Sequence, residues 1–404
     1  NLEFGTGGMR GIMGVGTNRI NKYTLGKSTQ GLSDYLKKYF PNKKEIKVVI
    51  AYDCRINSKS LSRQVAEVFS ANGIQVCLFS DLRPTPELSF AVKHLNAQCG
   101  IVLTASHNPP EYNGYKVYWE DGGQIVPPHD NKIINQIDKT EFSDINFTPN
   151  EELITLIDQE IDEAFFNVSI ELGKFKVQNR KNYKVVFTSL HGASITAVPQ
   201  VLEKAGYSQV YLVKEQSKPD GNFPTVKSPN PEEPEALKLA LLEAEKQGAD
   251  IVIGTDPDCD RLGIAVRDET GEFCLLNGNQ TMVVMTYFLL EQWKQKNALN
   301  GNQFIASTIV SSPMIAKIAL SYGVGYKETL TGFKWIAKLI EDFPELEFIG
   351  GGEESFGYLV GNKVRDKDAV TATLLACEVG AYAKSIGKSF FEILEDCYRE
   401  FGAY

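Results

Sequence analysis

Hydrophobic and polar positions alternate between two patterns in the first part of the chain. Three apolar runs bounded by polar residues are typical of buried strands, and two stretches between them repeat apolar residues every three or four positions, as amphipathic helices do. The strands are predicted at 47–55, 74–80 and 99–106, and the helices at 58–73 and 85–96. The pattern therefore predicts a β-α-β-α-β unit that ends on Ser106.

The same order of patterns recurs twice further along the chain. The second copy runs from 183 to 260 and ends on Asp256, Asp258 and Asp260, and the third runs from 304 to 355 and ends on two glutamates. A polar loop thus follows the last strand each time. This common placement favours a triplicated unit over three unrelated units joined in one chain.

Strands that alternate with helices form largely parallel sheets with both faces covered, and ligands bind beyond the carboxyl ends of the strands. A Thr-Gly turn within 267–276 adds a predicted hairpin. We therefore expect an α/β fold of three tandem related units with mixed, mostly parallel sheets and an active site in the cleft between them. The expected domains are residues 1–150, 151–276 and 277–390.

Composition narrows the possible partners. The chain has 404 residues and a formal net charge of −9, which argues against nucleic acid because a phosphate backbone favours clustered Lys and Arg. A small anionic substrate is still compatible if basic residues gather locally. The longest apolar run, 281–290, is too short to span a bilayer and predicts a buried helix. With no signal-peptide pattern and seven cysteines without a C-x-x-C pair, the chain is expected in the cytoplasm.

The first polar loop carries a candidate nucleophile. Ser106 is expected on a sharp loop at a strand end, followed by His107 and Asn108. A serine in such a place can be exposed for nucleophilic attack or phosphorylation, although serines also end strands without any chemical role. No G-x-S-x-G elbow surrounds it, which argues against acyl transfer. Lys116, ten positions further on, is expected at the same rim.

The second loop carries candidate metal ligands. Asp256, Asp258 and Asp260 alternate with other residues, so an extended loop would point all three carboxylates to one side. Such charges repel one another unless a cation neutralises them; the alternative is an ordinary solvated acidic turn. Arginines stand where an EF-hand needs glycine and glutamate, which excludes that calcium loop. Mg²⁺ completes its shell with phosphate oxygens and water, so it is the expected metal.

The third loop carries candidate sugar ligands. Glu353, Glu354 and Ser355 follow three consecutive glycines, which let a backbone approach a ligand closely. Their carboxylates and hydroxyl can bind sugar hydroxyls, and an exposed acidic turn is an equally good interpretation of this loop alone. At the start of the chain, FGTGGMRG offers glycine amides and Arg10, a combination suited to phosphate.

Taken together, FGTGGMRG, TASHNPPEYNGYK, DPDCDR and GEES resemble the four signatures of the α-D-phosphohexomutase family, in the same order and over nearly the whole chain. The stretches YDCR, RPTPELSFAV and TGFKWIAKLI also resemble it. The resemblance implies an isomerase of the phosphoglucomutase or phosphomannomutase type that interconverts sugar 1-phosphate and 6-phosphate, with glucose and then mannose as candidate sugars. It also implies a phosphoserine enzyme, a bisphosphate intermediate, Mg²⁺, and glucose 1,6-bisphosphate as activator.

The resemblance also assigns roles to individual residues. The implied catalytic residues, which carry the phosphoryl group, transfer protons or balance charge, are Ser106, His107, Lys116, Arg261 and Arg10. The implied metal ligands are Ser106, Asp256, Asp258 and Asp260. The implied substrate-binding residues are Glu353, Ser355, Thr331, Gly332 and Lys334.

Two departures from the family pattern are visible. Some relatives carry a histidine two residues after the serine of the sugar loop, where this chain has Gly357, so another group must transfer a proton there. The family also has a fourth domain with an Arg-Ser-Gly-Thr type of phosphate loop, and nothing similar precedes Tyr404. Residues 391–404 are therefore expected to begin a linker to a missing domain, and these 404 residues alone are expected to have little mutase activity.

Two other functions stay open on the sequence. A Mg²⁺-dependent sugar phosphatase would pass the phosphoryl group from the same serine to water, and a non-catalytic phosphosugar-binding protein would bind sugar without any transfer. Ser106, Lys116 and the aspartates together favour the mutase. Small sugar phosphates are the expected partners, without nucleic acid or membrane, and the sequence indicates no oligomeric state.

Overall fold

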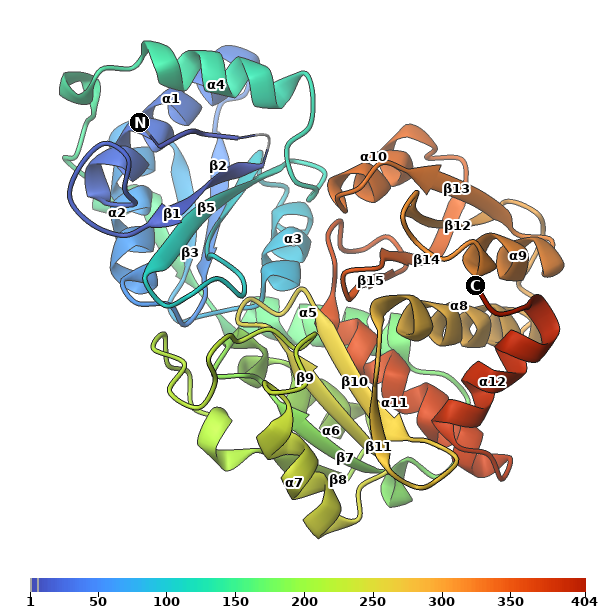
Figure 1. The fold of residues 1–404 in the computed structure, drawn as a ribbon. Helices are drawn as coiled ribbons and strands as arrows, with labels where there is room; N and C mark the ends of the chain where they lie inside the picture. The colour runs from blue at the N-terminus through green and yellow to red at the C-terminus, as the bar shows by residue number, and fades with distance from the viewer. Residues whose placement is uncertain (1, 6) are drawn as a thin grey trace.

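The computed structural model describes residues 2–5 and 7–404, and in this part of the chain it forms three α/β units (Figure 1). The first unit is built on a six-stranded sheet with the order β1-β5-β4-β2-β3-β6. Its elements are β1 (Gly8–Ile12), α1 (Lys22–Tyr39), β2 (Lys47–Tyr52), α2 (Ser58–Ala71), β3 (Gln75–Phe79), α3 (Thr85–His94), β4 (Cys99–Leu103), β5 (Tyr112–Trp119), α4 (His129–Lys139) and β6 (Ile154–Ile157).

The second unit has a five-stranded sheet with the order β11-β10-β9-β7-β8, and the third has a four-stranded sheet with the order β13-β12-β14-β15. The second contains α5 (Gln159–Gly173), β7 (Lys184–Thr188), α6 (Val198–Ala205), β8 (Gln209–Leu212), α7 (Lys238–Gln247), β9 (Ile251–Thr255), β10 (Leu262–Arg267) and β11 (Phe273–Leu276). The third contains α8 (Gly278–Gln295), β12 (Gln303–Thr308), α9 (Met314–Ser321), β13 (Gly325–Thr329), α10 (Lys334–Asp342), β14 (Glu347–Glu353), β15 (Gly357–Val360), α11 (Ala369–Ser385) and α12 (Phe390–Phe401).

All three sheets share one topology. The strand that precedes each polar loop (β4, β9 or β14) pairs in parallel with the first strand of the repeated pattern (β2, β7 or β12). That first strand pairs in parallel with the next (β3, β8 or β13), and the strand after the loop (β5, β10 or β15) returns antiparallel. The predicted α/β class with mixed, mostly parallel sheets is confirmed, and the repeated order supports triplication. The hairpin predicted at 267–276 joins β10 and β11.

One apolar cluster runs through all three units, beside smaller clusters within the first and the second. Strand β2 reads KVVIAY and is buried over almost its whole length, as parallel strands covered on both faces are. One continuous cluster of buried side chains includes Val49 of the first sheet, Val185 of the second and Phe304 of the third. Helix α11 follows the third sheet in sequence but packs on α5 and α6 of the second unit, as Figure 1 shows. The polar loops are therefore held by packed units in mutual contact.

The last helix belongs to this shared core. Residues 391–404 lie mostly in α12, where Phe390, Leu394 and Cys397 are buried. The helix packs on α8 and β10, and Ser389 caps its N-terminus by accepting a hydrogen bond from the Glu392 amide.

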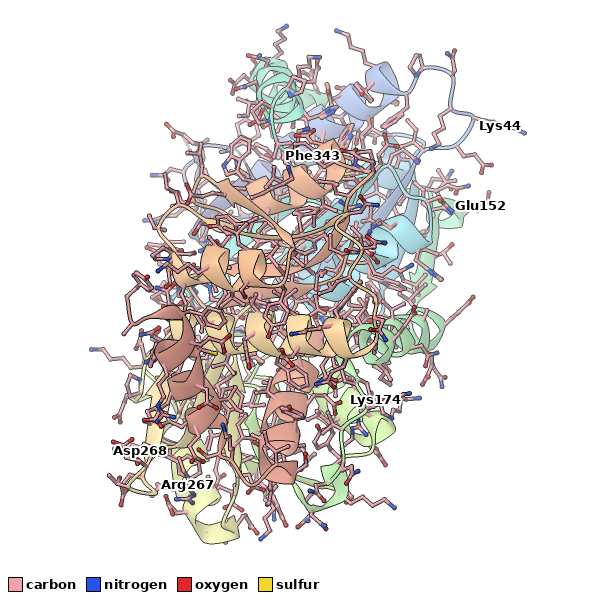
Figure 2. The ribbon with its side chains drawn as sticks, turned by 90° about the vertical axis from the view of Figure 1, so that its right-hand side faces the viewer. Lys44, Glu152, Lys174, Arg267, Asp268 and Phe343 are labelled. Atoms are coloured by element: carbon pink, nitrogen blue, oxygen red, sulfur yellow. The ribbon has the colours of Figure 1, made fainter. Side chains whose placement is uncertain are left out.

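Charged side chains extend from the outside of the molecule, for example the exposed Lys44 and Glu152 (Figure 2). The apolar run predicted as a buried helix at 281–290 lies within α8 and is largely buried. Among the described residues, no helix is both long enough and apolar enough to cross a membrane.

Candidate active site

The three polar loops converge on one place. Ser106 Oγ of the first unit donates a hydrogen bond to Asp256 Oδ2 of the second at 2.7 Å. Lys116, on β5 of the first unit, lies with its Nζ 2.6 Å from Asp258 Oδ2 and 3.0 Å from Asp260 Oδ2. Lys367, between β15 and α11 of the third unit, brings its Nζ to 3.3 Å from Asp260. All three units therefore contribute side chains to the aspartate cluster.

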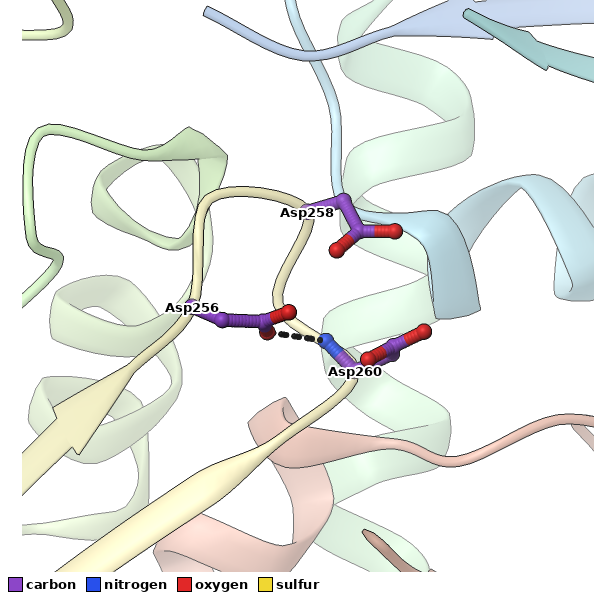
Figure 3. Close-up of side chains that lie close together, drawn as sticks. All are labelled: Asp256, Asp258 and Asp260. Carbon is purple, nitrogen blue, oxygen red and sulfur yellow. Dashed lines mark hydrogen bonds between the residues drawn. The ribbon is translucent and has the colours of Figure 1, made fainter. Parts of the chain in front are cut away.

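The aspartates form a compact, buried group (Figure 3). One oxygen from each of Asp256, Asp258 and Asp260 lies within 4.8 Å of the others. The loop is a turn and not the extended segment that the sequence suggested, because Cys259 has a left-handed φ of 61° and its N–H donates to Asp256 O at 3.0 Å. Asp256 Oδ1 accepts from the Asp260 and Arg261 amides at 3.0 Å each. The carboxylates thus converge because the loop turns at Cys259, and not because side chains alternate along a strand.

The cluster has the electrostatics of a cation site. Burial and the charges of Asp258 and Asp260 raise the pKa of Asp256 well above its usual value. Burial acts in the same direction on Asp260, but the charges of Lys116 and Lys367 outweigh it and hold its pKa below its usual value. Within the described residues, Asp258 Oδ1 and Asp260 Oδ1 are buried without a hydrogen-bond partner. Two orphaned carboxylate oxygens beside a third carboxylate are ligands that a divalent cation would satisfy.

Ser106 is nearly inaccessible. The sequence suggested an exposed serine, but the side chain and backbone are only 3% exposed, because the aspartate loop of the second unit covers them. His107 Nδ1 lies 3.2 Å from Ser106 Oγ. Burial, assisted by the charge of Arg261, lowers the pKa of His107 to about 4, so its ring is neutral at pH 7. Arg10, on β1, donates to Asn108 Oδ1 at 2.9 Å and so lies against the same loop.

Other cationic groups are held by specific partners. Arg261 follows the aspartates, forms an ion pair with Glu232, and lies within 4.0 Å of Asp260 Oδ1.

Asp258 is also held by a residue without charge. Thr85, at the start of α3, donates from its Oγ1 to Asp258 Oδ2 at 2.9 Å, and its amide donates to Asp258 O at the same distance. The first unit therefore fixes Asp258 through two residues, Lys116 and Thr85.

The predicted sugar loop borders this cluster. Glu353 ends β14 and is 8% exposed, and burial raises the pKa of its carboxyl. Ser355 is half-buried, and the next residue, Phe356, accepts a hydrogen bond at its carbonyl from the Leu262 amide at 3.0 Å. This bond ties the sugar loop to the strand that follows the aspartates. Glu354 points elsewhere, since its Oε2 accepts from Thr308 Oγ1 at 2.9 Å.

The TGFK stretch lies at the rim and not in the cluster. Thr331 is exposed and Gly332 half-buried in the loop before α10, and within the described chain no hydrogen bond joins them to Ser106 or the aspartates. Lys334 begins α10 and lines a cavity of about 290 Å³ with Trp119 of the first unit. Phe333 lies between Gly332 and Lys334 in sequence. The centre of its ring is 5.5 Å from Lys367 Nζ, so it connects this rim to the aspartate cluster.

Comparison with known proteins gives the family. Three models match in order: phosphoglucomutase/phosphomannomutase, alpha/beta/alpha domain I over residues 1–144, domain II over 163–271 and domain III over 277–401. The chain belongs to the phosphoglucomutase/phosphomannomutase family. A member of this family is a mutase, an enzyme that converts a sugar phosphate into the isomer with the phosphoryl group at another position.

Individual relatives agree with this assignment. The chain is 39% identical over 410 residues to a phosphoglucomutase of Staphylococcus epidermidis, covering 100% of this chain and 73% of that protein. It is 36% identical over 425 residues to a human phosphopentomutase, covering 99% and 68%. The fold resembles that of parafusin, a phosphoglucomutase of Paramecium solved in an open form, with a TM-score of 0.78, 22% identity and coverage of 99% and 74%.

Two residues of the candidate site carried no signal strong enough to assign them from sequence. Lys367 lies in a polar segment after β15, and a Cβ at Gly357 would be only 2.2 Å from Lys367 Cδ. The lysine therefore fills the space beside the position where some family members have a histidine. Arg55 stands in the YDCR stretch that resembles the family, and it lies buried beneath the serine loop.

Proposed function

We propose that this chain carries the phosphoserine and metal sites of a mutase that interconverts the 1-phosphate and 6-phosphate of a hexose, glucose or mannose, through phosphorylated Ser106. The observation that carries the proposal is the 2.7 Å contact between Ser106 Oγ and Asp256 Oδ2. It joins the candidate nucleophile of one unit to the buried carboxylates of another. Family membership supplies the reaction type, phosphoryl transfer between positions of a sugar.

Asp256, Asp258 and Asp260 are the residues that would hold Mg²⁺, and their orphaned oxygens fit such an ion. The ion would supply positive charge beside the phosphoryl group on Ser106. The chain itself also supplies positive charge that balances the phosphoryl group. Arg10 lies beside the serine loop and Arg261 lies beside the aspartate loop.

The transfer has a simple balance of bonds. The bond between Ser106 Oγ and phosphorus breaks while a bond from phosphorus to the free sugar hydroxyl forms, which gives a sugar bisphosphate. The hydroxyl loses a proton and Ser106 Oγ regains one. We assign these transfers to His107 and Lys116, since His107 is neutral at pH 7 and the charges of Asp258 and Asp260 keep Lys116 protonated despite its burial. The bisphosphate then turns and returns its other phosphate to Ser106.

The sugar hydroxyls are assigned to the third loop. Glu353 accepts from hydroxyl groups and Ser355 donates or accepts, which suits a sugar that binds in two orientations. Lys367 faces the same place and takes over the position of the absent histidine. Thr331, Gly332 and Lys334 are assigned to the rim of the sugar site.

Peptide mapping and intact-mass measurement test the proposal directly. The chain is incubated with Mg²⁺ and glucose 1,6-bisphosphate, the proposed activator, beside the Ser106→Ala variant. One phosphate on Ser106, absent from the variant, is the expected result. Conversion of glucose 1-phosphate and mannose 1-phosphate to the 6-phosphates, followed in parallel, ranks the sugars.

Other outcomes separate the alternatives. Release of inorganic phosphate without isomerisation would indicate a phosphatase. Sugar binding that persists in Ser106→Ala, with no phosphate on the unaltered chain, would indicate a binding protein and overturn the proposal.

A further inference from the structure

Arg55 is anchored to the backbone of the serine loop. Its Nη2 donates to Ser106 O at 2.6 Å and also to Asn108 O. Its Nη1 donates to Pro109 O at 2.9 Å and to Tyr112 O at 3.0 Å. The planar guanidinium thus binds four carbonyls of one loop, a fork geometry that a lysine cannot reproduce.

Asp53 completes the arrangement from the end of β2. Its Oδ2 lies 3.5 Å from Arg55 Nε and accepts from Thr104 Oγ1 at 2.6 Å, and neither charged side chain has any exposed surface. Thr104 Oγ1 in turn accepts from the Ser106 amide at 2.9 Å. Ser106 is therefore held at its N–H by Thr104 and at its carbonyl by Arg55, and both holders depend on Asp53.

The serine needs such support because of its backbone. Ser106 has a φ of 51°, in the left-handed region that residues with a Cβ rarely adopt. Strained conformations of this kind persist only where the surroundings over-determine them, and they gather at reactive sites. Without Thr104 and Arg55, the loop would relax and Ser106 Oγ would leave its place beside Asp256.

The second unit closes over the same pair. The Phe223 ring lies 5.2 Å from the Arg55 guanidinium, as in a cation–π contact. Gly221 approaches so closely that a Cβ there would lie 2.5 Å from the Ile56 amide nitrogen. These contacts keep water away from the buried Asp53–Arg55 ion pair. Burying two charges costs free energy, and packed apolar residues in their place could stabilise the fold equally well, so stability alone does not explain the pair.

We infer that Asp53, Arg55 and Thr104 are positioning residues that set the place of Ser106 Oγ for phosphoryl transfer, without touching the sugar phosphate. This inference rests on the proposed function of Ser106. It predicts that loss of the clamp slows transfer and leaves the binding of the sugar bisphosphate unchanged.

The test follows phosphate incorporation on Ser106 from glucose 1,6-bisphosphate and Mg²⁺ by time-resolved intact mass. Arg55→Ala should reduce the maximal rate roughly 100-fold, the scale of loss when a reacting group is misplaced by about 1 Å, with an unchanged half-saturating concentration. Added methylguanidine should restore part of the rate by binding the same carbonyls. Arg63→Ala is the matched control, because Arg63 lies on α2 and pairs only with Glu67 and Glu151 in the described chain, and it should transfer normally.

A second variant covers the case in which Arg55→Ala fails to fold. Thr104→Val keeps the shape of the side chain and removes the acceptor for the Ser106 amide, so it should also slow transfer at unchanged half-saturation. Transfer at the unaltered rate in folded Arg55→Ala or in Thr104→Val would overturn the inference while the proposed function stands. Absence of phosphate on Ser106 in the unaltered chain would overturn both.

Discussion

Lys116 Nζ, on β5 of the first unit, lies 2.6 Å from Asp258 Oδ2 in the loop of the second unit. The aspartate side chain is fully buried and the lysine side chain is 12% exposed. Removing one partner of a buried ion pair costs far more than the pair contributes net, because the other charge is left uncompensated. The packing of the first unit against the second therefore depends on the charge balance between Lys116 and the aspartate cluster.

Lys116→Met should lower the free energy of unfolding of the metal-free chain by about 3 kcal/mol. Mg²⁺ should restore part of this loss, since a bound cation replaces the missing charge. Phosphorylation of Ser106 should still be at least about 100-fold slower, because a residue assigned to the proton transfers of this reaction is then absent. Urea unfolding with and without Mg²⁺ measures the first effect, and intact mass measures the second.

The control for this variant is Lys384→Met, which removes a partly exposed pair with Asp250. It should change the unfolding free energy by less than about 1 kcal/mol, with or without Mg²⁺. Equal losses in the two variants would show that burial of the Lys116 pair has no special weight.

Asp260→Asn should remove the response to metal. In the unaltered chain, Mg²⁺ at 100 times its Kd should raise the free energy of unfolding by about 2.7 kcal/mol. The variant loses a carboxylate and leaves Lys116 and Lys367 without their shared partner, so its melting temperature should not change on addition of Mg²⁺. Asp268→Asn, eight positions further along on the β10–β11 turn, should respond like the unaltered chain. A Mg²⁺ response retained in Asp260→Asn would place the ion elsewhere.

The order of the three loops was predictable, because each follows the last strand of a repeated apolar pattern. Ser106, Asp256 and Glu353 were found in this way, because ligands of open α/β sheets bind beyond the carboxyl ends of the strands. The burial of Ser106 was not predictable, since Asp256 of another unit causes it. The turn at the aspartates depends on the left-handed backbone of Cys259, and a cysteine in the sequence does not indicate such a conformation.

Lys367 and Arg55 escaped assignment for a related reason. Each acts through contacts with loops far away in sequence. Arg55 is the last residue of a predicted strand and Lys367 lies in a polar segment, and neither place indicates a chemical role. Lys367 meets Asp260 only because α11 packs on the second unit, and Arg55 meets Ser106 only through the pairing of β2 with β4. Sequence patterns identify strand ends, whereas tertiary packing decides which distant cations reach them.

Glu378 holds α11 to the second unit. Its fully buried carboxylate accepts from Arg180 Nε at 2.6 Å, from the Tyr207 hydroxyl at 2.7 Å and from the Phe175 amide at 2.8 Å. Glu378→Ala would leave all three donors unsatisfied and should lower the free energy of unfolding by about 3–5 kcal/mol in urea unfolding. Glu400→Ala, an exposed change on α12, should cost no more than about 0.5 kcal/mol. A loss below about 1 kcal/mol for Glu378→Ala would contradict this role.

A buried carboxyl between the units predicts an unusual pH dependence of stability. Glu87, on α3, is fully buried. The charges around it are Arg83 just before α3, Asp158 and Asp162 beside or on α5, and Asp368 at the start of α11. Burial, with the neighbouring Asp162, raises the pKa of Glu87 well above its usual value. Arg83 offsets this rise in pKa only in part, because it binds Asp162 at 2.7 Å and lies 3.9 Å from Glu87. The fold therefore favours the protonated form of Glu87.

The sign of the effect follows from this raised pKa. The protonated carboxyl contributes fully to stability below the unfolded pKa of about 4.3, and the contribution is lost as the pH rises toward the folded pKa. Glu87→Gln keeps a donor toward Asp162 and cannot ionise, so it should match the unaltered chain at pH 4 and exceed its unfolding free energy by about 1 kcal/mol or more at pH 8. Asp162→Asn tests the same pair from the other side: it removes the acceptor and the bidentate partner of Arg83, and should destabilise at both pH values. Parallel pH profiles for Glu87→Gln and the unaltered chain, measured by urea unfolding from pH 4 to pH 8, would show that Glu87 is ionised in the fold.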